Sequence, residues 1–367
     1  MAGARNQDEH HGFDRPSKRG TRPRTKQRPT HDDALFGTVV SVDRGRYTLA
    51  VGELAVLAMK ARELRDRIVV GDKVAIVGDT SGNPDALARI VRIEPRTSVL
   101  RRTADDSDPY ERIVVANADQ LVIVAACANP EPRVGMIDRA VVAAYDAGMT
   151  ATLVLTKADL ASPAHLTALY EPAGVQVIAT EPRYDGAGHT IRSDGGTLSI
   201  NEDSLNVIRA ALLGKTSVFL GHSGVGKSTL VNALVPGAER ATGAVNDTTG
   251  RGRQTSTSVV ALQLPDDAGW VIDTPGIRSL GLAHVETEHV IAAFPELAAV
   301  ADAECPRGCT HLADSPDCAL DVWVRADPVL QASRELRLES LRRLLASRAA
   351  AADALALHAS QIARRNQ

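Results

Sequence analysis

Three short motifs constrain this chain of 367 residues more than any other feature, and they come in an unusual order. Thr156-Lys157-Ala158-Asp159 is the first, Gly221-His222-Ser223-Gly224-Val225-Gly226-Lys227-Ser228 is the second, and Asp273-Thr274-Pro275-Gly276 is the last. Each follows a short apolar run that predicts a strand. The second matches the G-x-x-x-x-G-K-S pattern of a phosphate-binding loop. Their order therefore narrows both fold and function.

The phosphate loop is the strongest local signal. Gly221 and Gly226 permit a tight turn, and backbone N–H groups cradle phosphates at the amino terminus of the helix that follows. Lys227 supplies a cation near the β- and γ-phosphates, and the Ser228 hydroxyl is a ligand for Mg²⁺. The motif, with a strand before it and a helix after it, predicts binding of a nucleoside triphosphate.

The first motif has the chemistry of guanine recognition. Asp159 can accept hydrogen bonds from N1–H and the amino group of guanine, which adenine does not offer in that pattern. The stem of Lys157 can cover the base. The usual pattern has Asn where Thr156 stands, so we expect weaker contacts to guanine N7 and to the phosphate loop. Ala179-Thr180 is the nearest candidate for the Ser-Ala motif that usually follows.

The motif order predicts a circularly permuted GTPase core, because an ordinary small GTPase begins with the phosphate loop and ends with the base motif. Strands are expected at 121–124, 152–155, 175–178, 217–220, 259–264 and 270–272, and helices at 136–147, 202–213 and 227–234. Strands of this kind alternating with helices imply a sheet that is covered on both faces.

The metal and switch positions follow from the third motif. Asp273 can reach Mg²⁺ through water, and the N–H of Gly276 can sense the γ-phosphate. The glycine-rich segment 249–257 lies where a switch loop belongs, and Thr255 is the expected Mg²⁺ ligand there, with Ser256 as second choice. An exposed basic approach to a hairpin is the alternative for this segment.

The position after the third motif holds Ile277, where many GTPases place a glutamine that orients water. Since Ile cannot do this, we expect slow intrinsic hydrolysis and stimulation by a partner. The residues expected to contact the nucleotide are Thr156, Lys157, Asp159, Gly221, His222, Ser223, Gly224, Val225, Gly226, Lys227, Ser228, Thr229, Asp273 and Gly276.

Residues 34–98 carry short β-rich runs separated by turns, which predicts a small barrel of the OB type. Strands are expected at 35–42, 47–51, 73–77 and 86–93. Phe36 and Tyr47 are the only aromatic residues in these strands, so few side chains are available to stack on bases. Shape and the charge of the RNA backbone would therefore dominate any binding of RNA. A barrel that only separates domains is the alternative.

The chain has four cysteines, and three of them lie close together in Cys305-x3-Cys309-x-His311-x6-Cys318. Three thiolates and one imidazole are a complete tetrahedral set for one structural Zn²⁺, with no position open for catalysis. Coincidental clustering is the alternative. The fourth, Cys127, lies in an apolar strand and is expected to be an inert core thiol.

The net charge of −3 hides a basic amino-terminal segment with eight Lys or Arg residues in the first thirty. This segment has few apolar residues and is expected to be disordered, either as a solvated tail or as an arm for nucleic acid. No secretory pattern or apolar run of membrane-spanning length occurs, so a cytoplasmic protein without a membrane partner is expected.

Taken together, these residues resemble the RsgA family of bacteria, the GTPases that depend on the small ribosomal subunit. Ala116-Asn117-Ala118-Asp119-Gln120 and Gly252-Arg253-Gln254-Thr255-Ser256-Thr257 are also similar to that family. The resemblance implies late maturation of the 30S subunit, GTP hydrolysis stimulated by that subunit, and contacts to 16S rRNA from the barrel and the zinc module. The family usually has His at the position of Gln254, and a Gln can orient water in its place.

The predicted organisation is multidomain: a disordered basic tail (1–33), an OB-type β-barrel (34–100), an α/β circularly permuted P-loop GTPase core (110–288) and a helical zinc-binding module (289–367). The predicted activity is GTP hydrolysis by a monomer that binds GTP or GDP, Mg²⁺ and Zn²⁺ and does not bind DNA. Gln254, Lys227 and Thr255 are the expected catalytic residues, and Ser228, Thr255 and Asp273 the expected Mg²⁺ sphere. The alternatives are an RNA-binding assembly chaperone that uses nucleotide only as a conformational switch, and an ATPase.

Overall fold

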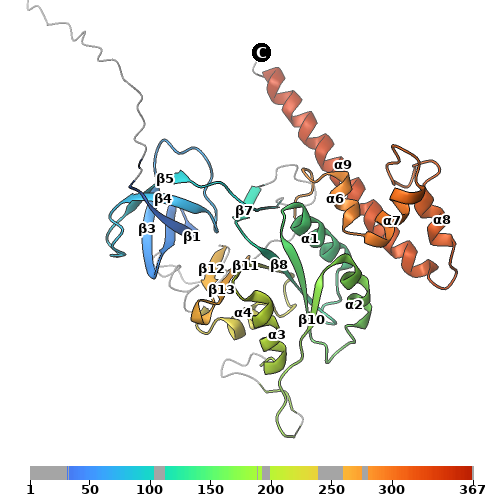
Figure 1. Ribbon diagram of the computed structural model, residues 1–367, viewed down its shortest axis with the longest axis horizontal. Helices are drawn as coiled ribbons and strands as arrows, with labels where there is room; N and C mark the ends of the chain where they lie inside the picture. Colours follow the sequence, from blue (N-terminus) through green and yellow to red (C-terminus); the bar gives the residue numbers. More distant parts are fainter. Residues whose placement is uncertain are drawn as a thin grey trace, which may run out of the picture. The chain divides into compact units, whose positions relative to one another are not determined.

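The computed structural model describes residues 31, 33–102, 112–187, 189–191, 199–238, 259–274 and 280–365. The chain divides into two units, residues 1–33 and residues 34–367, and all the helices and strands named here belong to the second (Figure 1). The predicted tail and the segment 249–257 fall outside the described residues.

Five strands form the barrel: β1 (Leu35–Asp43), β2 (Arg46–Val51), β3 (Leu54–Lys60), β4 (Lys73–Gly78) and β5 (Ala88–Ile93). They pair in the order β1-β2-β3-β5-β4, and β4 pairs back onto β1, which closes the barrel. Alternate side chains point inward, among them Val39, Leu49 and Ile90, so the barrel has an apolar core of its own. The predicted barrel is confirmed, although the sequence analysis missed β3.

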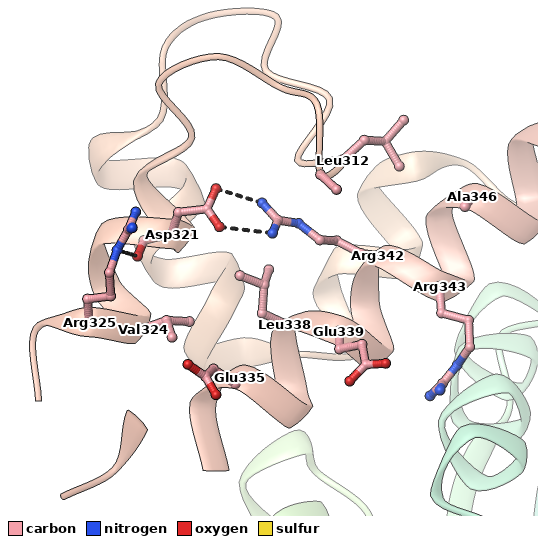
Figure 2. Close-up of a pocket in the computed structure, with 11 residues that line it drawn as sticks. Leu312, Asp321, Val324, Arg325, Glu335, Leu338, Glu339, Arg342, Arg343 and Ala346 are labelled. Atoms are coloured by element: carbon pink, nitrogen blue, oxygen red, sulfur yellow. Dashed lines mark hydrogen bonds and ion pairs between the residues drawn. The ribbon is translucent and has the colours of Figure 1, made fainter. Parts of the chain in front are cut away.

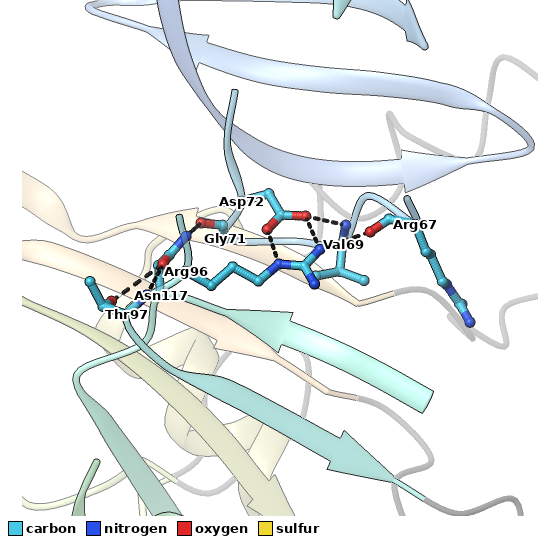
Figure 3. Close-up of polar contacts among 7 residues, drawn as sticks. All are labelled: Arg67, Val69, Gly71, Asp72, Arg96, Thr97 and Asn117. Carbon is cyan, nitrogen blue, oxygen red and sulfur yellow. Dashed lines mark hydrogen bonds and ion pairs between the residues drawn. The ribbon is translucent and has the colours of Figure 1, made fainter. Parts of the chain in front are cut away.

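Polar contacts connect the barrel to the segments that flank the next two strands, β6 (Val99–Arg102) and β7 (Arg112–Ala116) (Figure 3). The fully buried carboxylate of Asp72 accepts two hydrogen bonds from Arg96, at 2.7 and 2.8 Å. The side-chain amide of Asn117 donates to the carbonyl of Gly71 at 2.9 Å and accepts from the N–H of Thr97 at 2.8 Å. The family-like motif around Asn117 therefore has a structural role, because its hydrogen bonds connect the barrel to the start of the GTPase core.

The core sheet contains β8 (Gln120–Ala126), β9 (Thr150–Thr156), β10 (Gln176–Ala179), β11 (Lys215–Gly221), β12 (Val260–Gln263) and β13 (Gly269–Asp273). Their order is β10-β9-β8-β11-β13-β12, with only β12 antiparallel to its neighbour. The chain runs outward from β8 through β9 to β10, whereas after β11 on the other side it passes to β12, the last strand in this order, and returns to β13. In a parallel sheet of this kind, ligands bind at the carboxyl ends of such a central strand pair.

Helices cover both faces of this sheet, as predicted (Figure 1). Leu121 and Ile123 of β8 share a core with α1 (Val134–Asp146) and α2 (Ala164–Tyr170), and a 3-10 turn (Glu171–Ala173) follows α2. Val122 and Val124 point to the opposite face, toward α3 (Glu202–Leu212) and α4 (Lys227–Leu234). A second 3-10 turn, Pro265–Asp267, connects β12 to β13. The near-continuous apolar runs of these strands reflect burial on both sides.

Four helices complete the described chain: α6 (Thr287–Ala292), α7 (Pro295–Glu304), α8 (Ala319–Arg325) and α9 (Gln331–Arg365). Their apolar side chains belong to the same core cluster as those of α1, for example Phe294, Leu320 and Leu341 with Ile137. The carboxylate of Asp138 on α1 is buried there, and it accepts hydrogen bonds from residues of α2 and α9. No helix in the described part of the chain is long and apolar enough to cross a membrane.

Candidate functional site

The phosphate loop connects β11 to α4 and depends on three glycines. Gly224 and Gly226 have left-handed backbones, with φ of +81° and +91°, which glycine adopts without steric cost. Gly221 lies so close to β8 that an added Cβ would come within 2.8 Å of the carbonyl oxygen of Val124. A larger residue at position 221 would therefore push the loop away from the neighbouring strand.

The third motif meets the phosphate loop because β13 lies beside β11 in parallel register. The ammonium of Lys227 forms an ion pair with Asp273 at the end of β13. The buried hydroxyl of Thr274 donates to the carbonyl of Phe219 at 2.6 Å, which fixes the end of this strand. The predicted phosphate-binding cation and the predicted Mg²⁺-binding carboxylate thus occupy one site.

The base motif is bonded directly to the phosphate loop. The buried hydroxyl of Thr156 donates to the carbonyl of Val225 at 2.6 Å. The ammonium of Lys157 donates to the carbonyls of Gly224, at 2.9 Å, and Asn129. Thr156 lies close enough to the loop for its short hydroxyl to make this bond, while the weaker contact expected relative to Asn stays a prediction.

Two adjacent hollows lie at this edge of the sheet. The larger, of about 770 Å³, is lined by the phosphate loop together with Lys157. The smaller, of about 80 Å³, is lined by Asp159 and Thr180, and the two hollows share Lys157, Gly226 and Thr229. A hollow at a phosphate loop next to one beside Asp159 matches the arrangement of phosphates and base in a bound nucleotide.

Some predicted residues cannot be placed. Gln254, Thr255, Ser256 and Gly276 lie outside the described residues, as does Ile277. The described part of the site brings together the other predicted nucleotide contacts: Thr156, Lys157, Asp159, Gly221, His222, Ser223, Gly224, Val225, Gly226, Lys227, Ser228, Thr229 and Asp273.

One residue of the larger hollow was missed by the sequence analysis. Arg133 lines it, and its Nη1 lies 3.0 Å from Nε2 of His222 in the phosphate loop. Arg133 follows β8, the strand beside β11. The sequence shows a basic residue in the segment after β8. Its place in the site can be inferred only when β8 and β11 are known to be neighbours.

The four predicted zinc ligands form one cluster. One ligand atom from each of Cys305, Cys309, His311 and Cys318 lies within 4.8 Å of the others. Nδ1 of His311 is 3.5 Å from the sulfur of Cys305 and 3.9 Å from that of Cys318. A tetrahedral zinc with Zn–S of about 2.3 Å and Zn–N of about 2.0 Å can be held by such a group after a small contraction. The residues present therefore fit a structural metal.

The environment of the cluster shifts the pKa values of its ligands in different directions, since hydrogen bonds from Ser315 and its neighbours lower the pKa of the Cys309 thiol against the effect of its burial. Burial raises the pKa of the Cys318 thiol to about 11, and burial followed by the charge of Arg342 lowers the pKa of His311. Arg342 of α9 donates to the carbonyl of His311 at 3.1 Å. It also donates to both carboxylate oxygens of Asp321, at 2.9 and 2.7 Å (Figure 2). The long helix thereby holds the cluster loop against α8.

Cys127 stands apart from this cluster. It is buried at the end of β8, and its N–H donates to the carbonyl of Thr156 at 2.8 Å. Burial, followed by the nearby charge of Asp159, raises the pKa of this thiol. Its low tendency to ionise agrees with the predicted inert core thiol.

Comparisons with known proteins agree with this geometry. Residues 93–283 match the model of the RsgA GTPase family. The "Small ribosomal subunit biogenesis GTPase RsgA" of Gemmatimonas aurantiaca is 37% identical over 263 residues, which are 72% of this chain and 80% of that protein. The protein of the same name from Ectopseudomonas mendocina is 36% identical over 316 residues, 86% of this chain and 84% of that protein.

Two solved structures share the fold. YloQ, described as a circularly permuted GTPase, superposes with a TM-score of 0.57 at 22% identity and covers 88% of this chain and 97% of its own. YjeQ from Thermotoga maritima does so with a TM-score of 0.56 at 24% identity, covering 85% and 98%. The permuted core predicted from the motif order is confirmed. The chain belongs to the RsgA GTPase family and is a GTP-hydrolysing enzyme that binds guanine nucleotide.

Proposed function

We propose that this protein hydrolyses GTP to GDP and phosphate during late maturation of the 30S ribosomal subunit, and that the subunit stimulates the reaction. The observation that carries the proposal is the bonding of the base motif to the phosphate loop through Thr156 and Lys157, which makes one site of two distant segments. The names of the curated relatives, small ribosomal subunit biogenesis GTPases, supply the partner.

In this proposal the loop binds the phosphates through backbone N–H groups and Lys227, and Asp159 reads guanine. Mg²⁺ would be held by Ser228, Asp273 and Thr255, hard oxygen ligands of the type this ion prefers. When bound, it would neutralise charge on the phosphates. The ion pair between Lys227 and Asp273 supports this arrangement. Once phosphate and metal are bound, the ammonium would contact the phosphate and the carboxylate would contact the metal.

Gln254 is proposed to orient the attacking water, because the position after the third motif is occupied by Ile277. Lys227 and Thr255 are the other proposed catalytic residues. Water is the nucleophile, and the charge that develops on the transferred phosphoryl group is stabilised mainly by positioned cations and donors.

The cluster of three cysteines and one histidine is proposed to bind one Zn²⁺ that stabilises the C-terminal helices. All four ligands come from the protein, so this metal would have no open position for chemistry. The hydrogen bonds from Arg342 to His311 and Asp321 support a structural role, because they couple the ligand loop to the long helix.

The ribosomal contacts are proposed to involve 16S rRNA, with the barrel and the zinc-binding region as the contact surfaces. Phe36 is exposed on the barrel, and the guanidinium of Arg92 lies 5.9 Å from the centre of its ring. A cation beside an exposed ring suits RNA. A monomer in the cytoplasm, with no DNA or membrane partner, completes this proposal.

The test is the rate of phosphate release with and without purified 30S subunits. We expect a rise of at least tenfold with 30S, and an unchanged rate would contradict the proposed stimulation. Lys227→Ala serves as the control for contaminating GTPases, because it should be inactive in both conditions. Gln254→Ala should reduce the stimulated rate strongly if this residue orients water.

The second candidate is an RNA-binding assembly chaperone in which nucleotide only switches the conformation. It predicts tight binding to 30S, different for GDP and a non-hydrolysable GTP analogue, and no rise in turnover. Equal affinity in both nucleotide states would count against this second candidate.

A further inference from the structure

Three basic side chains in the described part of the chain line the larger hollow: Lys157, Lys227 and Arg133. Two of them have protein partners there. Lys227 is paired with the carboxylate of Asp273, and Lys157 donates to two backbone carbonyls. Arg133 is not paired with a carboxylate among the described residues. Arg133 also lies outside the three motifs.

The fold explains why Arg133 reaches the phosphate loop. Arg133 is the residue before α1, which follows β8 after a short connection. β8 and β11 are parallel neighbours with Val124 opposite Gly221, so both segments leave the sheet at the same edge. The near contact of Gly221 with the carbonyl of Val124 keeps the two connections close.

The contact with His222 sets the direction of the guanidinium. Nη1 of Arg133 lies 3.0 Å from Nε2 of His222. Arginine has only donors, so the ring nitrogen accepts in this contact. Arginine has five N–H donors, and this contact uses one. The rest of the planar fork can bind two phosphate oxygens at once.

The location of Arg133 favours the end of the nucleotide away from the base. The smaller hollow, beside Asp159, shares Gly226 and Thr229 with the larger one, whereas Arg133, His222 and Ser223 line only the larger. A nucleotide with its base at Asp159 would therefore extend its phosphates toward Arg133. The phosphate farthest from the base is the one that GTP has and GDP lacks.

We propose that Arg133 binds the terminal phosphate of GTP and stabilises the charge on it during hydrolysis. The proposal rests on the function proposed above and adds a residue to its machinery. A water oxygen forms a bond to the γ-phosphorus, and the bond to the β–γ bridging oxygen breaks with its electron pair left on GDP. A water proton passes to the released phosphate. Arg133 supplies in cis the positive charge that some GTPases obtain from a partner's arginine.

The test uses Arg133→Gln, which removes the charge, and Arg133→Lys, which keeps it without the planar fork. Arg209→Gln is the matched control, because Arg209 lies on the exposed surface of α3 and pairs there with Glu202 at 2.5 Å. The measurements are the dissociation constants for fluorescent GDP and for a non-hydrolysable GTP analogue, and the single-turnover rate of hydrolysis. Thermal unfolding checks that each variant is folded.

We expect Arg133→Gln to weaken the GTP analogue about tenfold and to leave GDP within about twofold, the loss typical of a charged hydrogen bond. The hydrolysis rate should fall by about 100-fold, as when an oxyanion donor is removed. Arg133→Lys should retain part of the affinity for the GTP analogue and part of the hydrolysis rate. Arg209→Gln should match the wild type.

Two results would overturn the inference: equal weakening of both nucleotides, which would mean that Arg133 only shapes the loop, or no change in either affinity or rate. Failure of the proposed function can be distinguished from these results, because it is measured with the wild-type protein alone. If the wild type binds neither GDP nor the GTP analogue, the nucleotide site itself is refuted, and the role of Arg133 falls with it.

Discussion

The nucleotide site and the cysteine-histidine cluster are assembled in opposite ways. The four ligands of the cluster lie within one stretch, from Cys305 to Cys318, and their ligand atoms are within 4.8 Å of one another. The nucleotide site joins Thr156 to Val225 across 69 positions of sequence, and Lys227 to Asp273 across 46. The cluster is a local site that a loop can form, whereas the nucleotide site exists only after the sheet has formed.

This difference predicts different responses to substitution. A ligand of the cluster should matter mainly for stability, because the metal is proposed to hold a loop and helices together. A residue of the nucleotide site should matter mainly for binding, because the sheet beneath it is packed against apolar clusters on both faces.

The largest expected effect is that of Lys227→Ala on nucleotide affinity and turnover. Removal of this ammonium leaves Asp273 without its partner beside the phosphates, so we expect at least a 100-fold loss of hydrolysis. The melting temperature without nucleotide should change by only a few degrees. Calorimetric titration with GDP and a thermal scan of the same sample check both parts. A large loss of stability would contradict the proposed difference between the two sites.

The cluster should show the reverse pattern with Cys309→Ser. We expect about one Zn²⁺ per chain in the wild type and loss of the metal in the variant, with a fall in the stability of the C-terminal helices of several kcal/mol. Metal analysis and thermal unfolding measure this. Cys127→Ser is the control, because Cys127 lies outside the cluster. A fully stable, metal-free wild type would refute the structural role.

A smaller effect is expected from Thr156→Val, which keeps the shape of the side chain and removes the hydroxyl that donates to Val225. The buried carbonyl loses its partner, and we expect GDP to bind about tenfold more weakly, from about 1–2 kcal/mol. Thr150→Val, on the exposed start of the same strand, is the control. Unchanged affinity in the Thr156 variant would mean that the base motif does not need this bond.

The smallest effect concerns Asp321, whose pKa is lowered mainly by its hydrogen bonds to Arg342. A carboxylate with a lowered pKa stabilises the folded state above its ordinary value of about 4, and this stability is lost as the pH falls through the folded-state pKa. The carboxylate is 36% exposed, so solvent screens the pair. We expect Asp321→Asn to remove a small, salt-sensitive part of the acid destabilisation, measured from unfolding curves between about pH 5 and about pH 2. Identical pH profiles would contradict it.

The sequence predicted the local features well, for physical reasons. The phosphate loop and the zinc ligands are short-range patterns, and the apolar runs of the core strands reflect burial on both faces. Motif order was enough to predict the permuted topology, because motifs that bind one ligand must meet at one edge of the sheet.

What could not be predicted depends on distant partners. The contact of Thr156 with the loop depends on the actual spacing of two backbones, which residue type alone does not give. The burial of Asp138 under α9 depends on a partner, Arg337, that is 199 positions away in sequence. Strand β3 (Leu54–Lys60) was missed because its short run has no clear polar-apolar alternation.

The most direct test of the central claim, that segments from distant parts of the chain form one guanine-nucleotide site, is the base preference of Asp159→Asn. Asparagine can donate to the second oxygen of xanthine but cannot accept both donors of guanine. We expect the variant to lose affinity for GDP by at least 100-fold and to gain affinity for xanthosine diphosphate, measured by calorimetry. Unchanged GDP binding by Asp159→Asn, or displacement of GDP from the wild type by excess ATP, would contradict the account.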